Sequence, residues 1–217
     1  KIFNNKKYFL RTYGCQMNVH DSEQIKFYLE KLGMSSTDKL EDADVVVLNT
    51  CAIRENAHDK VIGYLGRCKH LKKENPNLII VVMGCMAGQV DVVEDLRENH
   101  KYIDLIIGTN NIYDLPRLLI EKTAKQNIEV YSNSDIVPEN IIYERDSKIS
   151  AWVNIMYGCD KFCTYCIVPF TRGRERSRKI ECVLEECKSL VENGYKEITL
   201  LGQNVNAYGT DLGLGYD

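Results

Sequence analysis

The sequence has no long apolar run and no excess of positive charge. None of its apolar stretches approaches the roughly 20 residues that a membrane-spanning helix requires. The N-terminal stretch KIFNNKKYFLRTYGC lacks the apolar core and the small-residue cleavage site of a secretory signal. With Lys+Arg 28 against Asp+Glu 31, the formal net charge of -3 excludes a global basic field that would draw the chain to nucleic acid. We therefore expect a cytoplasmic protein without membrane contact, in which any RNA contact is local.

Histidine is scarce, with four residues, whereas cysteine is abundant, with nine. An odd number of cysteines without a secretion signal indicates reduced thiols used in metal or redox chemistry, and it speaks against a disulfide framework. The 217 residues, 44% of them hydrophobic, can bury a sizeable core and form one large or two modest domains.

Residues 1–124 alternate short apolar runs with helical patterns. The apolar runs are rich in Val, Ile and Leu, which is typical of parallel strands buried on both faces. They cover residues 7–14, 44–50, 78–84 and 104–109. Helical patterns follow them over residues 21–33, 55–73, 87–99 and 111–123. This alternation predicts an N-terminal α/β domain with right-handed crossovers and a doubly wound parallel sheet. In the first helix we expect Asp21 or Ser22 as the cap and Gly33 at the end.

Residues 125–147 break this rhythm with polar and turn residues around Pro138, and they are predicted to be a linker. The second domain, 148–217, begins with a strand over 151–158. A helix over 180–193 and a strand over 197–202 follow the cysteine-rich loop. These elements form one βαβ unit, and a two-stranded parallel unit cannot cover both of its faces. We therefore expect the second domain to be incomplete in this sequence.

Three cysteines share one context, because each directly follows a predicted buried strand. They are Cys15 in TYGCQMN, Cys51 in LNTCAIR and Cys85 in VMGCMAG. The carboxyl ends of parallel strands converge on the crevice where open sheets bind ligands, so this spacing favours a metal site made of three thiolates. The alternative is that each is an ordinary buried core thiol. Cys68, Cys182 and Cys187 lie within helical patterns, and we assign them to packing.

The loop GCDKFCTYCIVP holds Cys159, Cys163 and Cys166 with C-x3-C-x2-C spacing. A structural zinc site would need a fourth protein ligand, and every histidine lies in the other domain. A ferredoxin-type cluster would need a fourth cysteine near the loop, and the next one, Cys182, lies in a predicted helix. What remains is a [4Fe–4S] cluster with three protein ligands and one iron open to a small molecule.

Five stretches together form a specific combination: TYGCQMN, NTCAIRENA, GCMAGQ, YGCDKFCTYCIVPFTRGRERSR and EITLLGQNVNAYG. This combination resembles the tRNA methylthiotransferase family of the MiaB type, within the radical S-adenosylmethionine superfamily. The resemblance covers essentially the whole chain. It implies a methylthiotransferase N-terminal domain followed by the start of a radical-SAM βα barrel. The implied reaction inserts a methylthio group at C2 of N6-isopentenyl-adenosine next to the anticodon of tRNA.

The resemblance also implies the cofactors and partners. Cys159, Cys163 and Cys166 would hold the radical [4Fe–4S] cluster, where S-adenosylmethionine binds the open iron. Cys15, Cys51 and Cys85 would hold a second [4Fe–4S] cluster that supplies sulfur. The expected partners are the tRNA anticodon stem-loop and a reductant such as flavodoxin or ferredoxin, and we expect a monomer.

Further residues are predicted to bind the cofactor or RNA. The arginines of TRGRERSRK are candidates for phosphate contacts because the guanidinium presents a planar fork to anions, although such a run is often only a solvated face. They are Arg172, Arg174, Arg176 and Arg178. Gly202 and Gln203 end the second barrel strand, where the superfamily contacts the methionine moiety, although a strand-terminating turn also explains Gly202. Tyr165 either packs near the adenine or fills the loop.

Three other functions stay open at this point. One is a methylthiotransferase for threonylcarbamoyl-adenosine in tRNA or for a ribosomal-protein aspartate. A second is a non-catalytic zinc or iron–sulfur binding module. A third, a cobalamin-binding domain ahead of a radical barrel, is disfavoured because the sequence has no Asp-x-His-x-x-Gly signature.

Overall fold

A computed structural model describes residues 3–52, 55–122, 129–131, 143 and 145–214. The chain separates into two compact units, Lys1–Ser134 (unit 1) and Asp135–Asp217 (unit 2). The division falls inside the range predicted as a linker, most of which lies outside the described residues. Each unit is described by itself below.

Unit 1 is built on a six-stranded parallel sheet with the strand order β2-β1-β3-β4-β5-β6. The strands are β1 (Lys7–Thr12), β2 (Ser35–Ser36), β3 (Val45–Thr50), β4 (Ile79–Gly84), β5 (Leu105–Ile107) and β6 (Glu129–Tyr131). Every residue of β3 is buried, as the continuous apolar run predicts for a strand that is covered on both faces. The predicted doubly wound parallel sheet is confirmed.

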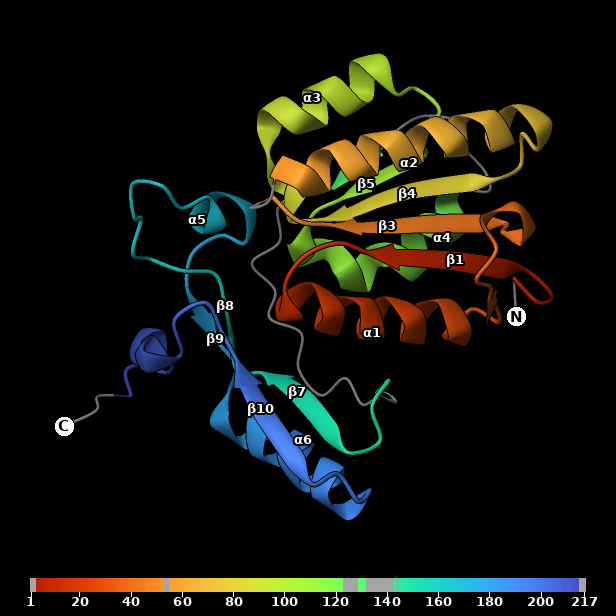
Figure 1. Ribbon diagram of the computed structural model, residues 1–217. Helices are drawn as coiled ribbons and strands as arrows, with labels where there is room; N and C mark the ends of the chain where they lie inside the picture. The colour runs from red at the N-terminus through yellow and green to blue at the C-terminus, as the bar shows by residue number, and fades with distance from the viewer. Residues whose placement is uncertain (1–2, 53–54, 123–128, 132–142, 144, 215–217) are drawn as a thin grey trace. The chain divides into compact units, whose positions relative to one another are not determined.

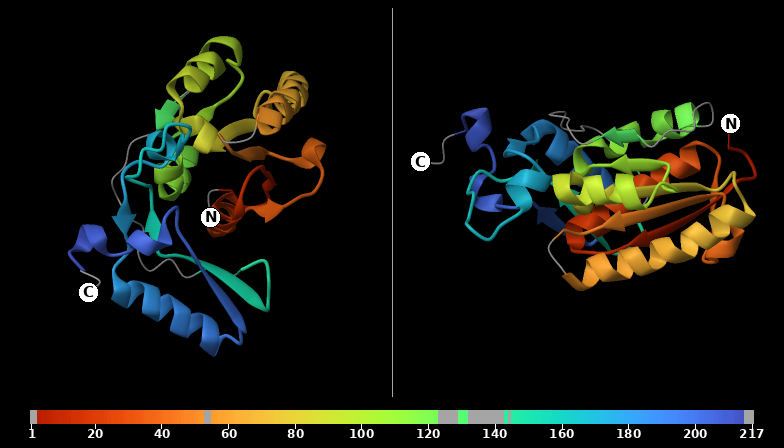
Figure 2. Two further views of the ribbon diagram at one scale, coloured as in Figure 1. Left: turned by 60° about the vertical axis from the view of Figure 1, so that its left-hand side comes forward. Right: turned by 90° about the horizontal axis from the view of Figure 1, so that it is seen from above.

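Helices cover both faces of this sheet (Figures 1 and 2). They are α1 (Gln16–Lys31), α2 (Glu55–Glu74), α3 (Val90–Asn99) and α4 (Leu115–Lys122). Alternation along β3 divides the core in two: Val46 and Leu48 pack with α2 and α3, whereas Val45 and Val47 pack with α1 and α4. The first of these cores includes Leu65 of α2.

The strand order reverses between β1 and β3, which are neighbours in the sheet although β2 separates them in the chain. In doubly wound sheets this topological switch point marks the crevice at the carboxyl ends of the strands where ligands bind. The register sets Thr12 opposite Asn49 and Thr50 opposite Gly84, so β1, β3 and β4 end at the same edge.

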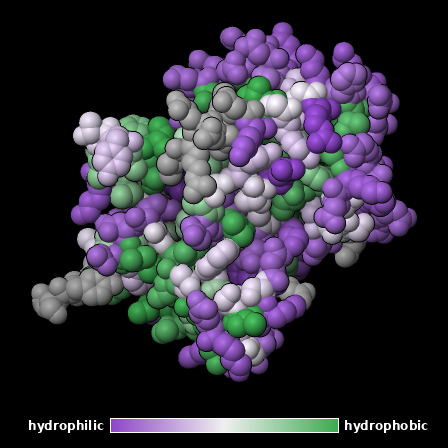
Figure 3. All heavy atoms as spheres, in the orientation of Figure 1, coloured by the Kyte–Doolittle hydropathy of each residue, from purple (hydrophilic) through white to green (hydrophobic). Residues whose placement is uncertain are grey.

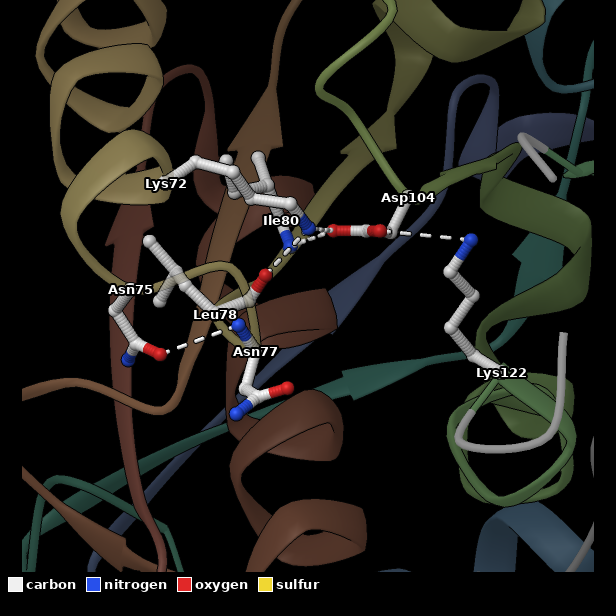
Figure 4. A network of polar contacts seen from close by, with 7 residues as sticks. All are labelled: Lys72, Asn75, Asn77, Leu78, Ile80, Asp104 and Lys122. Atoms are coloured by element: carbon white, nitrogen blue, oxygen red, sulfur yellow. Dashed lines mark hydrogen bonds and ion pairs between the residues drawn. The ribbon is translucent and has the colours of Figure 1, made fainter. Parts of the chain in front are cut away.

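Charged side chains meet at the opposite, amino-terminal edge of the sheet (Figure 4). Asp104 precedes β5 and accepts hydrogen bonds from Lys72 Nζ at 2.5 Å and from the backbone N–H of Ile80 at 2.8 Å. Lys122 Nζ lies 3.4 Å from the other carboxylate oxygen, and Lys72 Nζ also donates to the carbonyl of Leu78. We call Lys72, Asp104 and Lys122 the amino-edge network. It joins the ends of α2 and α4 to β4 and β5.

Two sequence predictions for unit 1 were wrong in detail. The first helix begins at Gln16, five residues before the predicted start, so Asp21 and Ser22 are buried residues inside it and cap nothing. Its predicted end is confirmed: Gly33 has φ 100° and donates to the carbonyl of Glu30. The strand β6 lies within the range predicted as a linker. It was missed because three residues at a sheet edge carry too little pattern to be recognised.

Unit 2 contains the predicted βαβ unit. The strands β7 (Ser150–Asn154) and β10 (Glu197–Leu201) are parallel, and α6 (Ile180–Glu192) connects them and ends before Gly194. Between β7 and α6 lie β8 (Met156–Tyr157), the cysteine loop with the one-turn helix α5 (Val168–Thr171), and β9 (Arg176–Ser177). The strands β8 and β9 pair in antiparallel orientation and close this loop at its base.

Hydrophobic side chains reach the surface over β10 and α6 of unit 2 (Figure 3). Leu200 is 49% exposed, and Leu184 and Val191 of α6 are 51% and 62% exposed. This uncovered apolar surface is what a two-stranded parallel unit leaves behind. Within the part of the chain that the structure describes, no helix combines the length and apolar character needed to cross a membrane.

Candidate functional site

The structure places Cys15, Cys51 and Cys85 at the carboxyl edge of the sheet in unit 1. Cys15 is the N-cap residue of α1, Cys51 directly follows β3, and Cys85 begins the short 3-10 helix η2 (Cys85–Gly88) that directly follows β4. Because β3 lies between β1 and β4, the register that pairs Thr50 with Gly84 sets Cys51 beside Cys85. The three predicted ligands therefore emerge from adjacent strands at the switch point.

Two glycines let the backbone come this close. Gly14 has φ 139°, and a Cβ built on it would lie 3.0 Å from Cys51 Cβ and 2.4 Å from Asn18 Oδ1. Gly84 has φ 99°, and its Cβ would lie 2.4 Å from the carbonyl oxygen of Thr50. A side chain at either position would separate the strand ends, so both sites require glycine.

Two buried amide side chains lie next to the strand ends that carry Cys15 and Cys51. Asn18 and Asn49 are both fully buried, and the Nδ2 of Asn18 donates to Asn49 Oδ1 at 3.4 Å and to the carbonyl of Thr50 at 3.0 Å. Asn49 Nδ2 donates in return to the carbonyl of Asn18 and to Ser22 Oγ, each at 2.8 Å. Asn18 Oδ1 accepts from the backbone N–H and from the thiol of Cys15, both at 3.3 Å. We call Asn18, Asn49, Ser22 and Thr50 the carboxyl-edge network.

The donor set at this edge suits a soft metal. Three thiols select iron–sulfur clusters, zinc or copper(I) over hard cations. Cys51 and Cys85 are buried, and Cys15 is partly exposed. Among the residues that the structure describes, no three His, Cys, Asp or Glu side chains form a group closed enough to hold a metal ion. Metal binding by Cys15, Cys51 and Cys85 therefore stays a prediction, which the strand register and the two glycines fit.

The other three thiols lie in the loop between β8 and β9 of unit 2. Cys159 is buried at the start of the loop, Cys163 is exposed, and Cys166 is partly exposed. The backbone N–H of Cys166 donates to the carbonyl of Cys163 at 2.9 Å, so a turn holds these two residues together. Metal binding by this triplet also stays a prediction.

An ion pair fixes the two arms of the loop to each other. Arg174 donates from Nε and Nη2 to the two carboxylate oxygens of Asp160 at 2.7 and 3.0 Å, and the backbone N–H of Glu175 donates to Asp160 at 3.0 Å. The Arg174 guanidinium, helped by this N–H, lowers the pKa of Asp160 from its ordinary value. Gly158, with φ 75°, packs so tightly that its Cβ would lie 2.0 Å from the carbonyl oxygen of Arg174.

The four arginines predicted to contact phosphate differ in their surroundings. Arg174 is exposed, and its guanidinium also lies 5.5 Å from the ring centroid of Phe162. Arg176 is partly buried and donates to the carbonyl of Arg172. Arg172 and Arg178 are each 4% exposed, and Arg178 pairs with Glu186 at 2.6 Å. Phosphate contact by this run stays a prediction, and the exposures single out Arg174 as the side chain that a phosphate can reach directly.

The residues predicted to contact the cofactor lie at two places in unit 2. Tyr165 is 93% exposed in the cysteine loop, so it does not fill the loop interior. Gly202 follows β10, and a Cβ on it would lie 2.6 Å from Met156 Cγ, so glycine is required there by packing. Gln203 Oε1 is buried and has no hydrogen-bond partner among the described residues.

Two further cysteines pack in or against the cores of their own units, whereas the assignment of Cys182 to packing stays a prediction. Cys68 is fully buried in the core between α2 and the sheet, and burial raises the pKa of its thiol to about 11. Cys187 packs partly buried against the core of unit 2, and burial raises the pKa of its thiol as well. The assignment of these two cysteines to packing is confirmed.

Sequence reasoning missed three polar residues of these sites: Asn18, Asn49 and Asp160. Asn18 and Asn49 stand within three residues of a strand-end cysteine, in GCQMN and LNTC, so their place in the motifs was a usable signal. Asp160 directly follows Cys159, and its partner Arg174 lies 14 residues later. No local pattern connects residues that far apart.

Comparison with known families finds a match in each unit. Residues 7–108 match the family described as uncharacterized protein family UPF0004, and residues 153–213 match the radical SAM superfamily. A radical SAM domain implies an iron–sulfur cluster and S-adenosylmethionine.

Curated relatives match nearly the whole chain. The protein of Halalkalibacterium halodurans is 55% identical over 95% of this chain and 39% of its own length. That of Thermoanaerobacter sp. is 54% identical over 96% and 45%, and that of Bacillus subtilis is 54% identical over 95% and 41%. All three are named tRNA-2-methylthio-N(6)-dimethylallyladenosine synthase. The chain thus spans less than half the length of these relatives. The chain is thus similar to the UPF0004 family over residues 7–108 and to the radical SAM superfamily over residues 153–213.

Proposed function

We propose that this chain acts in a radical-SAM methylthiotransferase that inserts a methylthio group at C2 of N6-isopentenyl-adenosine next to the anticodon of tRNA. The observation that carries the proposal is that the chain has two cysteine triplets, one in each unit, and that its relatives share one name. One triplet stands at the switch point of the UPF0004 domain, and the other stands in the radical SAM loop. The relatives, 54–55% identical to this chain, bear the name of that synthase.

The triplet of unit 2 would hold the radical cluster and S-adenosylmethionine. When bound, these groups supply a radical able to remove hydrogen from an unreactive C–H bond. The thiol of Cys159 would be held at a fixed place, because Cys159 is buried and its backbone N–H donates to the carbonyl of Gly173. The buried Oε1 of Gln203, an acceptor, suits the ammonium group of the methionine moiety.

The triplet of unit 1 would hold the second cluster, the source of the transferred sulfur. Three protein thiolates leave one iron of a [4Fe–4S] cluster without a protein ligand, where an external sulfur can bind. The backbone N–H and the thiol of Cys15 both donate to the amide oxygen of Asn18, which is uncharged. This neutral side chain adds no charge beside a bound cluster.

The substrate RNA would be held locally, as the net charge of -3 requires. Arg174 is exposed and lies over the ring of Phe162, which in turn contacts Phe170; the two rings are 49% and 68% exposed. Exposed aromatic rings with a neighbouring guanidinium suit unstacked RNA bases and phosphates. A reductant such as flavodoxin or ferredoxin would supply the electrons, and we propose a monomeric protein.

The proposal is tested by nucleoside mass spectrometry. A bacterial strain that lacks its own synthase is complemented with the complete gene that contains this coding sequence, either wild type or carrying Cys51→Ser or Cys159→Ser. We expect 2-methylthio-N6-isopentenyl-adenosine with the wild type alone, and unmodified N6-isopentenyl-adenosine with both variants. Cys68→Ser is the matched control, because Cys68 is buried in the core away from the strand ends, and it should keep the modification.

The result also separates the alternatives. Methylthiolated threonylcarbamoyl-adenosine in place of the expected nucleoside would assign the chain to the sibling activity. Full modification by the Cys51→Ser variant would contradict a role for the unit 1 triplet, and no change in any nucleoside would leave a metal-binding module.

A further inference from the structure

The carboxyl-edge network uses every hydrogen-bonding group of its two amides. Asn18 Nδ2 makes two bonds, Asn49 Nδ2 makes two, and each Oδ1 accepts at least one. Both side chains are fully buried. A buried amide with all its partners in place has one orientation, because any rotation would leave a polar atom unsatisfied.

The bonds of these amides run between the strand ends that carry the cysteines. Asn18 belongs to the first turn of α1 and reaches the carbonyl of Thr50, the residue before Cys51. Its Oδ1 accepts from the backbone N–H of Cys15 at 3.3 Å. One side chain therefore contacts the residue that carries the first thiol and the residue next to the second.

The same network reaches the third strand end. Thr50 Oγ1 donates to the carbonyl of Met83 at 2.6 Å, two residues before Cys85. Asn49 Oδ1 lies 2.6 Å from the point that a Cβ on Gly84 would occupy, so the glycine backbone packs directly on the amide. The ends of β1, β3 and β4 are thus joined through three polar side chains.

We propose that Asn18 and Asn49 are positioning residues for the sulfur ligands of unit 1, holding Cys15, Cys51 and Cys85 at one edge so that a metal cluster meets a preformed set of thiols. The inference rests on the proposed function, since it assumes that these three thiols bind iron. A metal-bound cysteine is a thiolate, so the hydrogen bond that the Cys15 thiol donates to Asn18 belongs to the metal-free protein. The hydrogen bond from the backbone N–H of Cys15 can persist when metal is bound.

A purely structural role is the competing explanation, because any buried amide stabilises a fold. The amino-edge network offers the comparison within the same sheet. Lys72, Asp104 and Lys122 also join helices to strand ends, at the edge opposite the cysteines. A change there should affect stability and leave iron binding untouched.

The experiment measures how fast iron leaves unit 1. The full chain carries Cys159→Ala, Cys163→Ala and Cys166→Ala in every sample, so that remaining iron reports on Cys15, Cys51 and Cys85. After anaerobic reconstitution this background should hold about four iron atoms per chain. Iron release to a chelator is then followed at a temperature where circular dichroism shows each variant to be folded.

Asn18→Ala and Asn49→Ala should each release iron at least about tenfold faster than the background, the usual effect of removing a group that orients a metal ligand. Lys72→Met, the matched control at the amino edge, should release iron at the background rate. The inference would be overturned if the folded asparagine variants released iron at the background rate, or if Lys72→Met released iron as fast as they do.

If an asparagine variant does not fold, Thr50→Val decides, because it removes only the hydrogen bond to the carbonyl of Met83. Faster iron release than the background supports the inference, and an unchanged rate overturns it. A background that takes up no iron would instead contradict the proposed function.

Discussion

The two edges of the sheet in unit 1 close their strand ends by different means. At the amino edge one carboxylate, Asp104, meets two ammonium groups, and its side chain is 12% exposed. At the carboxyl edge neutral amides and hydroxyls meet, and the two asparagines there are fully buried. The amino edge satisfies its charges internally, whereas at the carboxyl edge the thiol of Cys15 donates to the uncharged amide oxygen of Asn18.

This difference shows what each edge is suited to do. Removing one charge of a buried ion pair leaves its partner uncompensated, so we expect the amino-edge network to stabilise the fold and to tolerate substitution poorly. Neutral amides orient a ligand set without adding charge, so an anionic cluster can be taken up beside them. Substitutions at either edge test this difference, because the two networks should contribute differently to the stability of the fold.

The largest effect is expected from Asp104→Ala. The change leaves two largely buried ammonium groups and the backbone N–H of Ile80 without their shared acceptor. The free energy of unfolding should fall by about 3–5 kcal/mol. Chemical denaturation of the metal-free protein measures it, and a loss of less than about 1 kcal/mol would show that the amino-edge network does not stabilise the fold as expected.

A slightly smaller effect is expected from Gly84→Ala at the other edge. Alanine must adopt φ 99° there, and its Cβ would clash with the carbonyl of Thr50. Strain and overpacking together should lower the free energy of unfolding by about 2–4 kcal/mol.

Gly63→Ala is the matched control for that change. Gly63 lies inside α2, and a Cβ on it meets nothing within 4 Å, so alanine should raise stability by about 0.5–1 kcal/mol through helix propensity. Equal effects of the two alanines would contradict the close approach of β3 and β4 at Gly84.

Asn49→Ala should cost less than either loss above. It removes the two hydrogen bonds that Asn49 Nδ2 donates, to the carbonyl of Asn18 and to Ser22 Oγ, and the expected loss is about 1–3 kcal/mol in the metal-free protein. The same denaturation measurement applies. A loss as large as that of Asp104→Ala would mean that the two edges contribute alike to the fold, and the contrast between them would disappear.

The smallest effect is expected in unit 2, from Asp160→Asn. Arg174 lowers the pKa of Asp160 in the folded protein, so the carboxylate contributes stability above its unfolded pKa of about 3.9, and that contribution is lost as pH falls through the lower folded value. Wild type and variant should therefore differ slightly in stability at pH 7 and converge once the pH has fallen below the folded pKa of Asp160. A difference that persists at the acid end would show that Asp160 acts through packing.

The sequence patterns predicted the parts of this fold that depend on local regularity. The strands Val45–Thr50 and Ile79–Gly84 follow from continuous apolar runs, and so do Cys51 and Cys85 directly after them. The first strand ends at Thr12, so Cys15 comes three residues after its strand and not directly after it, as was predicted. The start of α1 was missed because its cap uses Cys15 and Asn18, while Asp21 and Ser22 looked like stronger caps.

The parts that escaped prediction depend on residues that only the fold brings together. Asn18 and Asn49 are 31 positions apart, and Asp104 is 32 positions from Lys72. Neither pairing has a periodic signature, since the contact exists only once β1, β3 and the helices are packed. The cysteines themselves were identifiable because each carries its own local context.

The most direct test of the account is the iron and sulfide content of the protein after anaerobic reconstitution. The wild type should hold about eight iron and eight sulfide ions per chain, and Cys51→Ala and Cys159→Ala should each hold about four of each, because each change removes a ligand from one cluster only. Wild-type content in Cys51→Ala would contradict the claim that the strand-end thiols of unit 1 hold a cluster of their own.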